Sequence, residues 1–146
     1  MLRGHATARV DEKGRVKVPA EFLDQFLELC GPERRIFVTS LDGKMVQVYP
    51  LPVWEEHERK IAALPRTNPA LENYLRTVNY WGKETQLDAA GRLLVHPSLR
   101  EATHLDGEAS VFGRQNTLEL CDHALFRGQP PTVSKEDLAQ LAALGL

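Results

Sequence analysis

The stretch that decides the fold is Asp11-Glu12-Lys13-Gly14-Arg15-Val16-Lys17-Val18-Pro19, and a related stretch returns as Asp88-Ala89-Ala90-Gly91-Arg92-Leu93-Leu94-Val95-His96-Pro97. Aspartate, glycine, arginine and two alternating aliphatic residues match without a gap, 77 positions apart. A second pair of segments, Val46-x-Val48-Tyr49 and Leu118-x-Leu120-Cys121, matches at a spacing of 72 positions. We infer that one unit was built twice and that the second copy is five residues shorter in its middle.

The first stretch has the residues of a polar turn that leads into a strand. An aspartate at the start of a turn accepts hydrogen bonds from the following backbone amides, and Gly14 tolerates the positive φ that such a turn demands. After the turn, Val16 and Val18 alternate with Arg15 and Lys17, as in a half-buried strand. If the chain binds a charged partner, we expect the contact on the arginine side of this strand.

Charge is unevenly distributed along the chain. The 146 residues carry a net charge of −2, whereas residues 1–20 hold five basic residues against Asp11 and Glu12 and sum to +3. The basic residues are Arg3, Arg9, Lys13, Arg15 and Lys17. Such a local basic surface on an acidic body attracts a polyanion to one place.

The composition, with 42% hydrophobic residues, is that of a globular protein with one compact unit or two closely packed halves. No apolar run approaches the roughly 20 residues of a membrane-spanning helix, and the N-terminus lacks the hydrophobic core of a signal peptide. We therefore expect a cytoplasmic protein with no membrane partner.

The remaining pattern predicts an alternation of short strands and helices. Strands are expected at 7–10, 15–18, 36–39, 45–49, 92–95, 109–113 and 117–121, and helices at 19–26, 53–64, 69–78, 97–102, 122–126 and from Lys135 onward. Asp42-Gly43 predicts a tight hairpin turn, and Trp54 is expected in the core. Asn68, Asp122 and Ser134 are expected to cap helices. The last helix, which follows a proline-rich spacer at 128–132, is expected to be loosely attached or to contact a neighbouring subunit.

The residues that could support metal binding or catalysis do not form a recognisable site. Cys30 and Cys121 are far apart in the sequence, and the five histidines lack the spacing of a helical metal site. We expect both cysteines to be packed as small hydrophobic residues. No phosphate-binding loop or nucleophile motif is present, so we expect no cofactor, no metal and no enzymatic activity.

Together, several segments resemble the MraZ family of bacterial transcriptional regulators. The segments are Arg3-Gly4, Asp11-x-x-Gly14-Arg15 with Pro19, Val48-Tyr49-Pro50, Leu64-Pro65, Asp88-x-x-Gly91-Arg92 and Pro97-x-Leu99-Arg100. The resemblance covers residues 1 to about 127. Leu23 departs from the pattern because an arginine often follows the first Pro-x-x-Phe, and His96 replaces the first of two prolines.

The resemblance implies an α+β fold: a tandem, pseudo-two-fold swapped-hairpin β-barrel of the SpoVT/AbrB class with peripheral helices. We expect repeats at 1–78 and 79–127, followed by a C-terminal spacer and helix at 128–146. The resemblance also implies a nucleoid-associated homo-oligomer, in the form of a ring, that binds double-stranded promoter DNA at repeated elements upstream of the division and cell-wall gene cluster.

The expected DNA-binding residues are Arg3, Arg9, Lys13, Arg15, Lys17 and Arg92, and the turn residues Asp11, Gly14, Asp88 and Gly91 are expected to shape the motif. Arg15 is the best candidate for reading a base. An alternative is that Arg15, like Arg92, pairs with the aspartate of its turn only to hold the turn in place. Lys13 and Lys17 correspond to Ala90 and Leu94, so we expect the first copy to dominate DNA contact and the corresponding face of the second copy to be largely buried.

Two other functions are compatible with the sequence. An enzyme would need a concave site, which a barrel filled with side chains does not offer. An oligomeric scaffold or protein-binding module of the same fold would not retard promoter DNA.

Overall fold

The computed structural model describes residues 1–146, which form eight strands, five α-helices and one 3-10 helix. In chain order the elements are β1 (His5–Val10), β2 (Arg15–Lys17), α1 (Ala20–Cys30), β3 (Arg35–Thr39), β4 (Val46–Pro50), α2 (Leu51–Ala62), α3 (Pro69–Trp81), β5 (Lys83–Gln86), β6 (Arg92–Leu94), α4 (Pro97–Thr103), β7 (Gly107–Arg114), β8 (Thr117–Asp122), η1 (His123–Phe126) and α5 (Lys135–Ala143).

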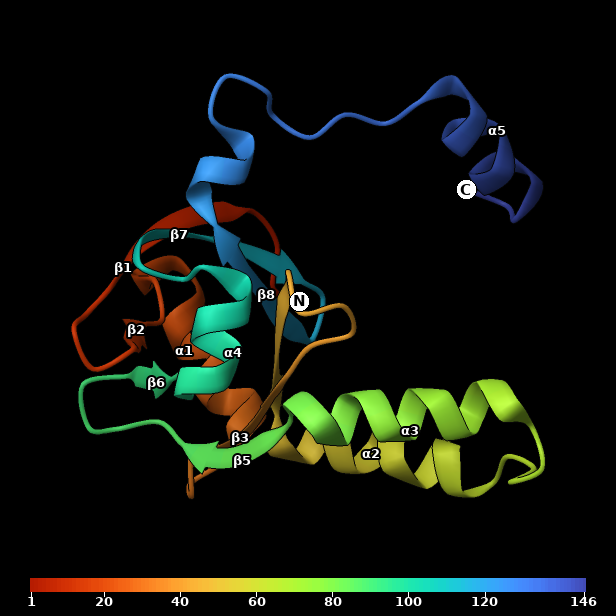
Figure 1. The fold of residues 1–146 in the computed structure, drawn as a ribbon, viewed down its shortest axis with the longest axis horizontal. Coiled ribbons are helices and arrows are strands. Elements are labelled where there is room, and N and C mark those ends of the chain that lie inside the picture. The colour runs from red at the N-terminus through yellow and green to blue at the C-terminus, as the bar shows by residue number, and fades with distance from the viewer.

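The strands form one antiparallel sheet in the order β5-β3-β4-β8-β7-β1-β2-β6, which curls into a nearly closed barrel (Figure 1). Strands of the two sequence repeats are interleaved in this sheet: the pairs β3-β4 and β1-β2 of the first repeat flank the pair β8-β7 of the second, and β5 and β6 of the second repeat stand at the two ends. β1 pairs with β7 of the second repeat, and β5 pairs with β3 of the first. β2 pairs with β6, and β4 with β8, so equivalent strands meet across the pseudo-two-fold axis. The predicted swapped-hairpin barrel is confirmed.

A single hydrophobic core of 20 buried residues draws on both repeats. The inward-facing residues of the strands alternate with exposed ones, so Val16 and Leu93 are buried at equivalent positions of β2 and β6. Phe22 and Phe26 lie four residues apart on α1 and close one side of the barrel core. Neither repeat could therefore bury its apolar surface without the other. The boundaries of the two repeats, at residues 78 and 127, stay a prediction from the sequence.

Several elements differ from the sequence expectations. α1 continues to Cys30, because Cys30 extends the buried stripe of Phe22 and Phe26 by one helical turn. β5 was not predicted, because Lys-Glu-Thr-Gln has no apolar alternation and becomes a strand only by pairing with β3. The β3–β4 hairpin is confirmed, but its connection is longer than a two-residue turn. In that connection the Asp42 carboxylate accepts hydrogen bonds from the amides of Lys44 (2.9 Å) and Met45 (3.0 Å).

The helices α2 and α3 form a pair that projects from one side of the barrel (Figure 1). Trp54 anchors α2 to the sheet, with its ring 4.5 Å from that of Phe37 and 4.8 Å from that of Tyr49, so the predicted core position is confirmed. The Asn68 side chain caps α3 by accepting from the Ala70 amide at 2.9 Å, as predicted. Leu64, expected on the apolar stripe of α2, is 52% exposed because the helix ends at Ala62.

The C-terminal segment leaves the barrel after η1 and carries α5 away from it (Figure 1). The predicted caps are present: Asp122 accepts from the Ala124 amide, and Ser134 accepts from the Asp137 amide. No residue of α5 is buried, and Leu138 and Leu144 are exposed. None of the helices has the length and hydropathy that crossing a membrane requires.

Candidate nucleic-acid interface

The first loop, Asp11 to Gly14, is held by the aspartate at its start. One carboxylate oxygen of Asp11 accepts from the amides of Lys13 and Arg15, both at 2.9 Å. The Asp11 carbonyl accepts from the Gly14 amide at 3.0 Å, and Gly14 has a φ of +81°. These contacts form the predicted turn and deliver Arg15 to the start of β2.

The second loop, Asp88 to Gly91, repeats this geometry. Its aspartate accepts from the amides of Ala90 and Arg92 at 2.9 Å, and Gly91 has a φ of +76°. The predicted roles of Asp11, Gly14, Asp88 and Gly91 in shaping the turns are consistent with these contacts.

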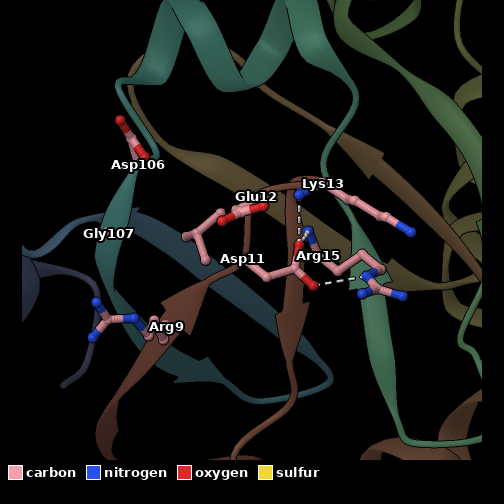
Figure 2. Close-up of a pocket in the computed structure, with 8 residues that line it drawn as sticks. Arg9, Asp11, Glu12, Lys13, Arg15, Asp106 and Gly107 are labelled. Atoms are coloured by element: carbon pink, nitrogen blue, oxygen red, sulfur yellow. Dashed lines mark hydrogen bonds and ion pairs between the residues drawn. The ribbon is translucent and has the colours of Figure 1, made fainter.

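Each arginine is pinned through one nitrogen only. Nε of Arg15 donates to Oδ2 of Asp11 at 2.7 Å, and Nε of Arg92 donates to Oδ2 of Asp88 at the same distance. The terminal nitrogens of both guanidinium groups make no hydrogen bond or ion pair within the chain, and the Arg15 side chain is 33% exposed. In Figure 2 the Arg15 guanidinium meets Asp11 at one edge only. The ion pair of the alternative interpretation is present, and it leaves the fork of each arginine free.

The same contacts lower the pKa of both carboxyl groups. For Asp11 the largest contribution is the hydrogen bond from the Arg15 amide, followed among the favourable contacts by that from the Arg15 side chain. Asp88 has the equivalent causes, led by the Arg92 amide. Both aspartates therefore stay ionised at neutral pH and orient their arginines.

The strands that follow the two loops form a ribbon of two paired strands, β2 and β6. Arg15 lies opposite Leu94, Val16 opposite Leu93 and Lys17 opposite Arg92. Because side chains alternate along a strand, the valine–leucine pair faces the core. The outer face of the ribbon carries the remaining residues Arg15, Lys17, Arg92 and Leu94. The basic residues of both repeats thus come together on this ribbon face.

The prediction that this face of the second copy is largely buried was wrong. Leu94 is 44% exposed, and β6 has the same burial pattern as β2. The physical reason is that the β2–β6 register and the pseudo-two-fold axis give both strands the same outward side, so Leu94 lies on the face that carries Lys17 in the first copy. A leucine on the polar face of a strand is therefore no evidence of burial here.

The other predicted cations are divided between two places. Arg9 and Lys13 line an open hollow of about 570 Å³ beside the first loop, together with Arg15 (Figure 2). Arg3 lies at the far end of β1, where it lines a different hollow with Arg114 of the β7–β8 hairpin. Since β1 is six residues long, Arg3 is separated from the first loop by the length of the strand. The structure therefore groups Arg9 with the loop and leaves Arg3 out.

Sequence reasoning missed two kinds of neighbour. Asp106, which is distant in the sequence, lines the same hollow as Arg9, Lys13 and Glu12, so a carboxylate of the other repeat also borders the basic loop. Arg100 of α4 reaches the first loop from the other repeat, and its Nη1 donates to the Glu12 carbonyl at 3.2 Å. The sequence relates Arg100 to Leu23 through the 77-residue spacing, but only the structure shows that each of the two residues lies behind the loop of the other repeat.

The cysteines and histidines show no metal-binding arrangement, since no group of three His, Cys, Asp or Glu side chains could hold a metal ion. Both cysteines are buried, as predicted. Burial raises the pKa of Cys30 to about 12, and burial with nearby carboxylates raises that of Cys121 to about 11. Both thiols are therefore protonated at neutral pH and behave as packed hydrophobic groups.

The interleaved barrel, with one Asp-x-x-Gly-Arg loop in each repeat, defines the class as a swapped-hairpin protein of the SpoVT/AbrB type. The family model described as "MraZ protein, putative antitoxin-like" matches residues 1–77 and 82–144, and the chain belongs to the MraZ family.

Curated relatives cover the chain closely and share one name, "Transcriptional regulator MraZ". The relative from Acidobacterium capsulatum is 42% identical and that from Koribacter versatilis 36% identical, with both chains of each pair covered completely. The relative from Nitrosococcus oceani is 35% identical over 99% of this chain and 98% of its own. These names describe regulators of transcription and not enzymes.

Proposed function

We propose that this chain is a DNA-binding transcriptional regulator whose contact surface is the first loop together with the outer face of the β2–β6 ribbon. The observation that carries the proposal is the arrangement of the Arg15 side chain, which is 33% exposed: Asp11 holds its Nε, and its terminal nitrogens make no hydrogen bond or ion pair within the chain. A guanidinium oriented in this way has lost part of its rotamer freedom before binding, so less entropy is lost when it contacts a base.

In this proposal the residues divide between base reading and phosphate binding. The planar fork of Arg15 is suited to donate to O6 and N7 of a guanine in the major groove. Lys13 and Lys17, both exposed, neutralise phosphates as point charges, and Arg9 extends the same surface. Arg92 occupies the equivalent place in the second repeat. Arg3, at the other end of β1, is proposed only as a distant phosphate contact.

The first repeat is proposed to dominate binding. Both loops present an arginine in the same way, but only the first has a lysine inside the loop and another on the following strand. Each phosphate contact adds a slope of roughly −0.9 to log K against log salt. The first repeat should therefore contribute most of the salt-dependent affinity.

A small patch of cations gives modest affinity, so we propose that a homo-oligomer, in the form of a ring, presents several copies of the patch to repeated promoter elements. After one subunit has bound, the next contact becomes intramolecular, and affinity rises only where the element spacing matches the subunit spacing. The elements proposed are those upstream of the division and cell-wall gene cluster. The exposed leucines of α5 are available for contact between subunits.

The test is electrophoretic retardation of the duplex upstream of the chain's own gene, with light scattering to follow oligomer mass. We expect the wild-type chain to retard this duplex and Arg15→Ala to lose most of the binding. Arg59→Ala is the matched control, because Arg59 is exposed on α2 and pairs only with Glu56. Unchanged retardation by Arg15→Ala, in an oligomer of unchanged mass, would contradict the proposal. An oligomer that retards no promoter duplex would instead support a scaffold.

A further inference from the structure

The outer face of the β2–β6 ribbon is nearly symmetric, and the symmetry is broken at one position. The pseudo-two-fold axis relates Arg15 to Arg92 and Lys17 to Leu94. The face thus carries three cations and one leucine. Lys17 and Leu94 therefore distinguish the two ends of an otherwise matched surface.

Leu94 is the only large apolar side chain of the eight strands that is exposed. The strands otherwise bury or half-bury their valine, leucine, isoleucine and aromatic residues. An isolated exposed leucine needs no explanation on an ordinary surface. Here it lies directly opposite Arg15, the arginine proposed to read a base, and on the same side of the ribbon.

We infer that Leu94 contacts the C5-methyl group of a thymine in the major groove, next to the base pair contacted by Arg15. This inference rests on the proposed function and extends it to the base sequence that the ribbon prefers. Thymine is the only base of unmodified DNA with a methyl group in the major groove, and apolar side chains recognise it there. The three cations around Leu94 are complementary to the DNA backbone and argue for DNA, rather than a second protein chain, as the occupant of this face.

The dimensions of the ribbon suit this contact. A two-stranded ribbon fits the major groove of B-DNA. Residues directly opposite each other in an antiparallel pair have Cβ atoms about 5 Å apart, and successive base pairs are separated by about 3.4 Å along the axis. Arg15 and Leu94 are therefore spaced to reach adjacent base pairs. Lys17, at the equivalent position of β2, cannot make the same contact. Leu94 therefore determines in which of the two orientations the ribbon binds its DNA site.

The experiment uses the full chain and the duplex from upstream of its own gene, with each thymine replaced in turn by deoxyuridine, which lacks the methyl group. We expect one thymine in each bound element at which the replacement weakens wild-type binding about four-fold, the value of one buried methyl-sized group. Leu94→Ala should bind the unmodified duplex more weakly and should no longer distinguish thymine from uracil at that position. Leu64→Ala, which removes another exposed leucine, in the α2–α3 connection, should discriminate as the wild type does.

A second variant, Leu94→Lys, tests the same contact by replacing the apolar side chain with a cation. Leu94→Lys makes the two ends of the ribbon alike, so it should abolish the thymine preference while steepening the salt dependence by about one phosphate contact. The inference is overturned if no deoxyuridine position weakens binding, or if the preference persists in Leu94→Ala. It is also overturned if Leu94→Ala changes the oligomer mass and leaves the preference intact, because the face would then contact protein.

The inference and the proposed function can fail separately. Retardation that depends on Arg15 but is indifferent to deoxyuridine overturns the role of Leu94 alone. A wild-type chain that does not retard the duplex overturns both.

Discussion

The two loops have the same backbone geometry but differ in charge and in support. Both use an aspartate that accepts from two amides and from the arginine side chain, and both use a glycine with positive φ. Only the first carries lysines, at positions where the second has alanine and leucine. The comparison shows that the two loops share a backbone conformation when they share only aspartate, glycine and arginine. The residues between and after these three can therefore differ, and they determine the charge of each loop.

The helices behind the loops differ as well. Gly14 lies against the backbone carbonyl of Val95 and the side chain of Arg100, whereas Gly91 lies against the flexible end of Leu23. A charged donor supports each loop from outside: Nη1 of Arg100 donates to the Glu12 carbonyl of the first loop, and Nη1 of Arg34 donates to the Asp88 carbonyl of the second, both at 3.2 Å. The difference lies behind the glycines, because a backbone carbonyl borders Gly14 and a flexible side chain borders Gly91.

The largest expected difference is in stability. In Gly14→Ala the new Cβ would lie 2.9 Å from the Val95 carbonyl oxygen, and in Gly91→Ala it would lie 3.0 Å from a Leu23 methyl that can move. A positive φ costs an alanine about 1–2 kcal/mol in either loop. We expect a loss of about 3 kcal/mol for Gly14→Ala and about 1–2 kcal/mol for Gly91→Ala. Urea unfolding of both variants measures the difference, and equal losses would show that the supports are equivalent.

The next difference is in DNA affinity. Arg15→Ala should weaken the free energy of DNA binding by about 2 kcal/mol for each first loop that contacts a guanine. Arg92→Ala should weaken it by about 1 kcal/mol or less, because the second loop has no neighbouring lysines. Fluorescence anisotropy with the upstream duplex at several salt concentrations compares the two variants. A larger loss for Arg92→Ala would reverse the proposed order of the repeats.

Replacing the supporting residue Arg100 should have a smaller effect on DNA affinity. Arg100→Leu removes the donor to the Glu12 carbonyl, and we expect it to weaken DNA binding by about 1 kcal/mol through a looser first loop. Arg100→Lys keeps the charge and is the matched control. If Arg100 acts as a support, Arg100→Leu should weaken binding and leave the salt slope unchanged. A slope reduced by about one would instead identify Arg100 as a phosphate contact.

The smallest difference is expected in acid, where the two loops should behave alike. Asp11 and Asp88 have pKa values below their ordinary range, so their contribution to stability is present above the unfolded-state value of about 3.9 and is lost as the pH falls below it. Asp11→Asn and Asp88→Asn should each remove a similar part of this acid dependence. Unfolding free energies measured between about pH 3 and 6 test the similarity.

Much of this fold could be predicted from the duplicated stretch. Residues whose role is set by local chemistry, such as Asp11, Gly14 and the cap Asn68, have the contacts that the sequence predicts. The resemblance to the MraZ family supplied the pairing of strands between the repeats, which no local pattern contains.

What the sequence could not supply depends on contacts between distant residues. β5 is a strand only because β3 offers it hydrogen-bonding partners. Leu94 is exposed because the β2–β6 pairing turns it to the outer face of the sheet, and the hydrophobic type of the residue suggested the opposite. Arg3 and Arg9 are both near the first loop in sequence, but the length of β1 separates Arg3 from it. Proximity along a strand is thus a poor guide to membership of a surface patch.

The interleaving of the strands also determines how the molecule can respond to a mismatched binding site. Arg15 and Arg92 stand on paired strands of one sheet, so no hinge lies between them and no domain rotation can change their separation. A duplex whose geometry does not match this fixed separation of the two arginines must itself bend or twist. The energy of that deformation depends on the flexibility of its base steps. Each subunit would then favour DNA that deforms easily, including at bases it never touches.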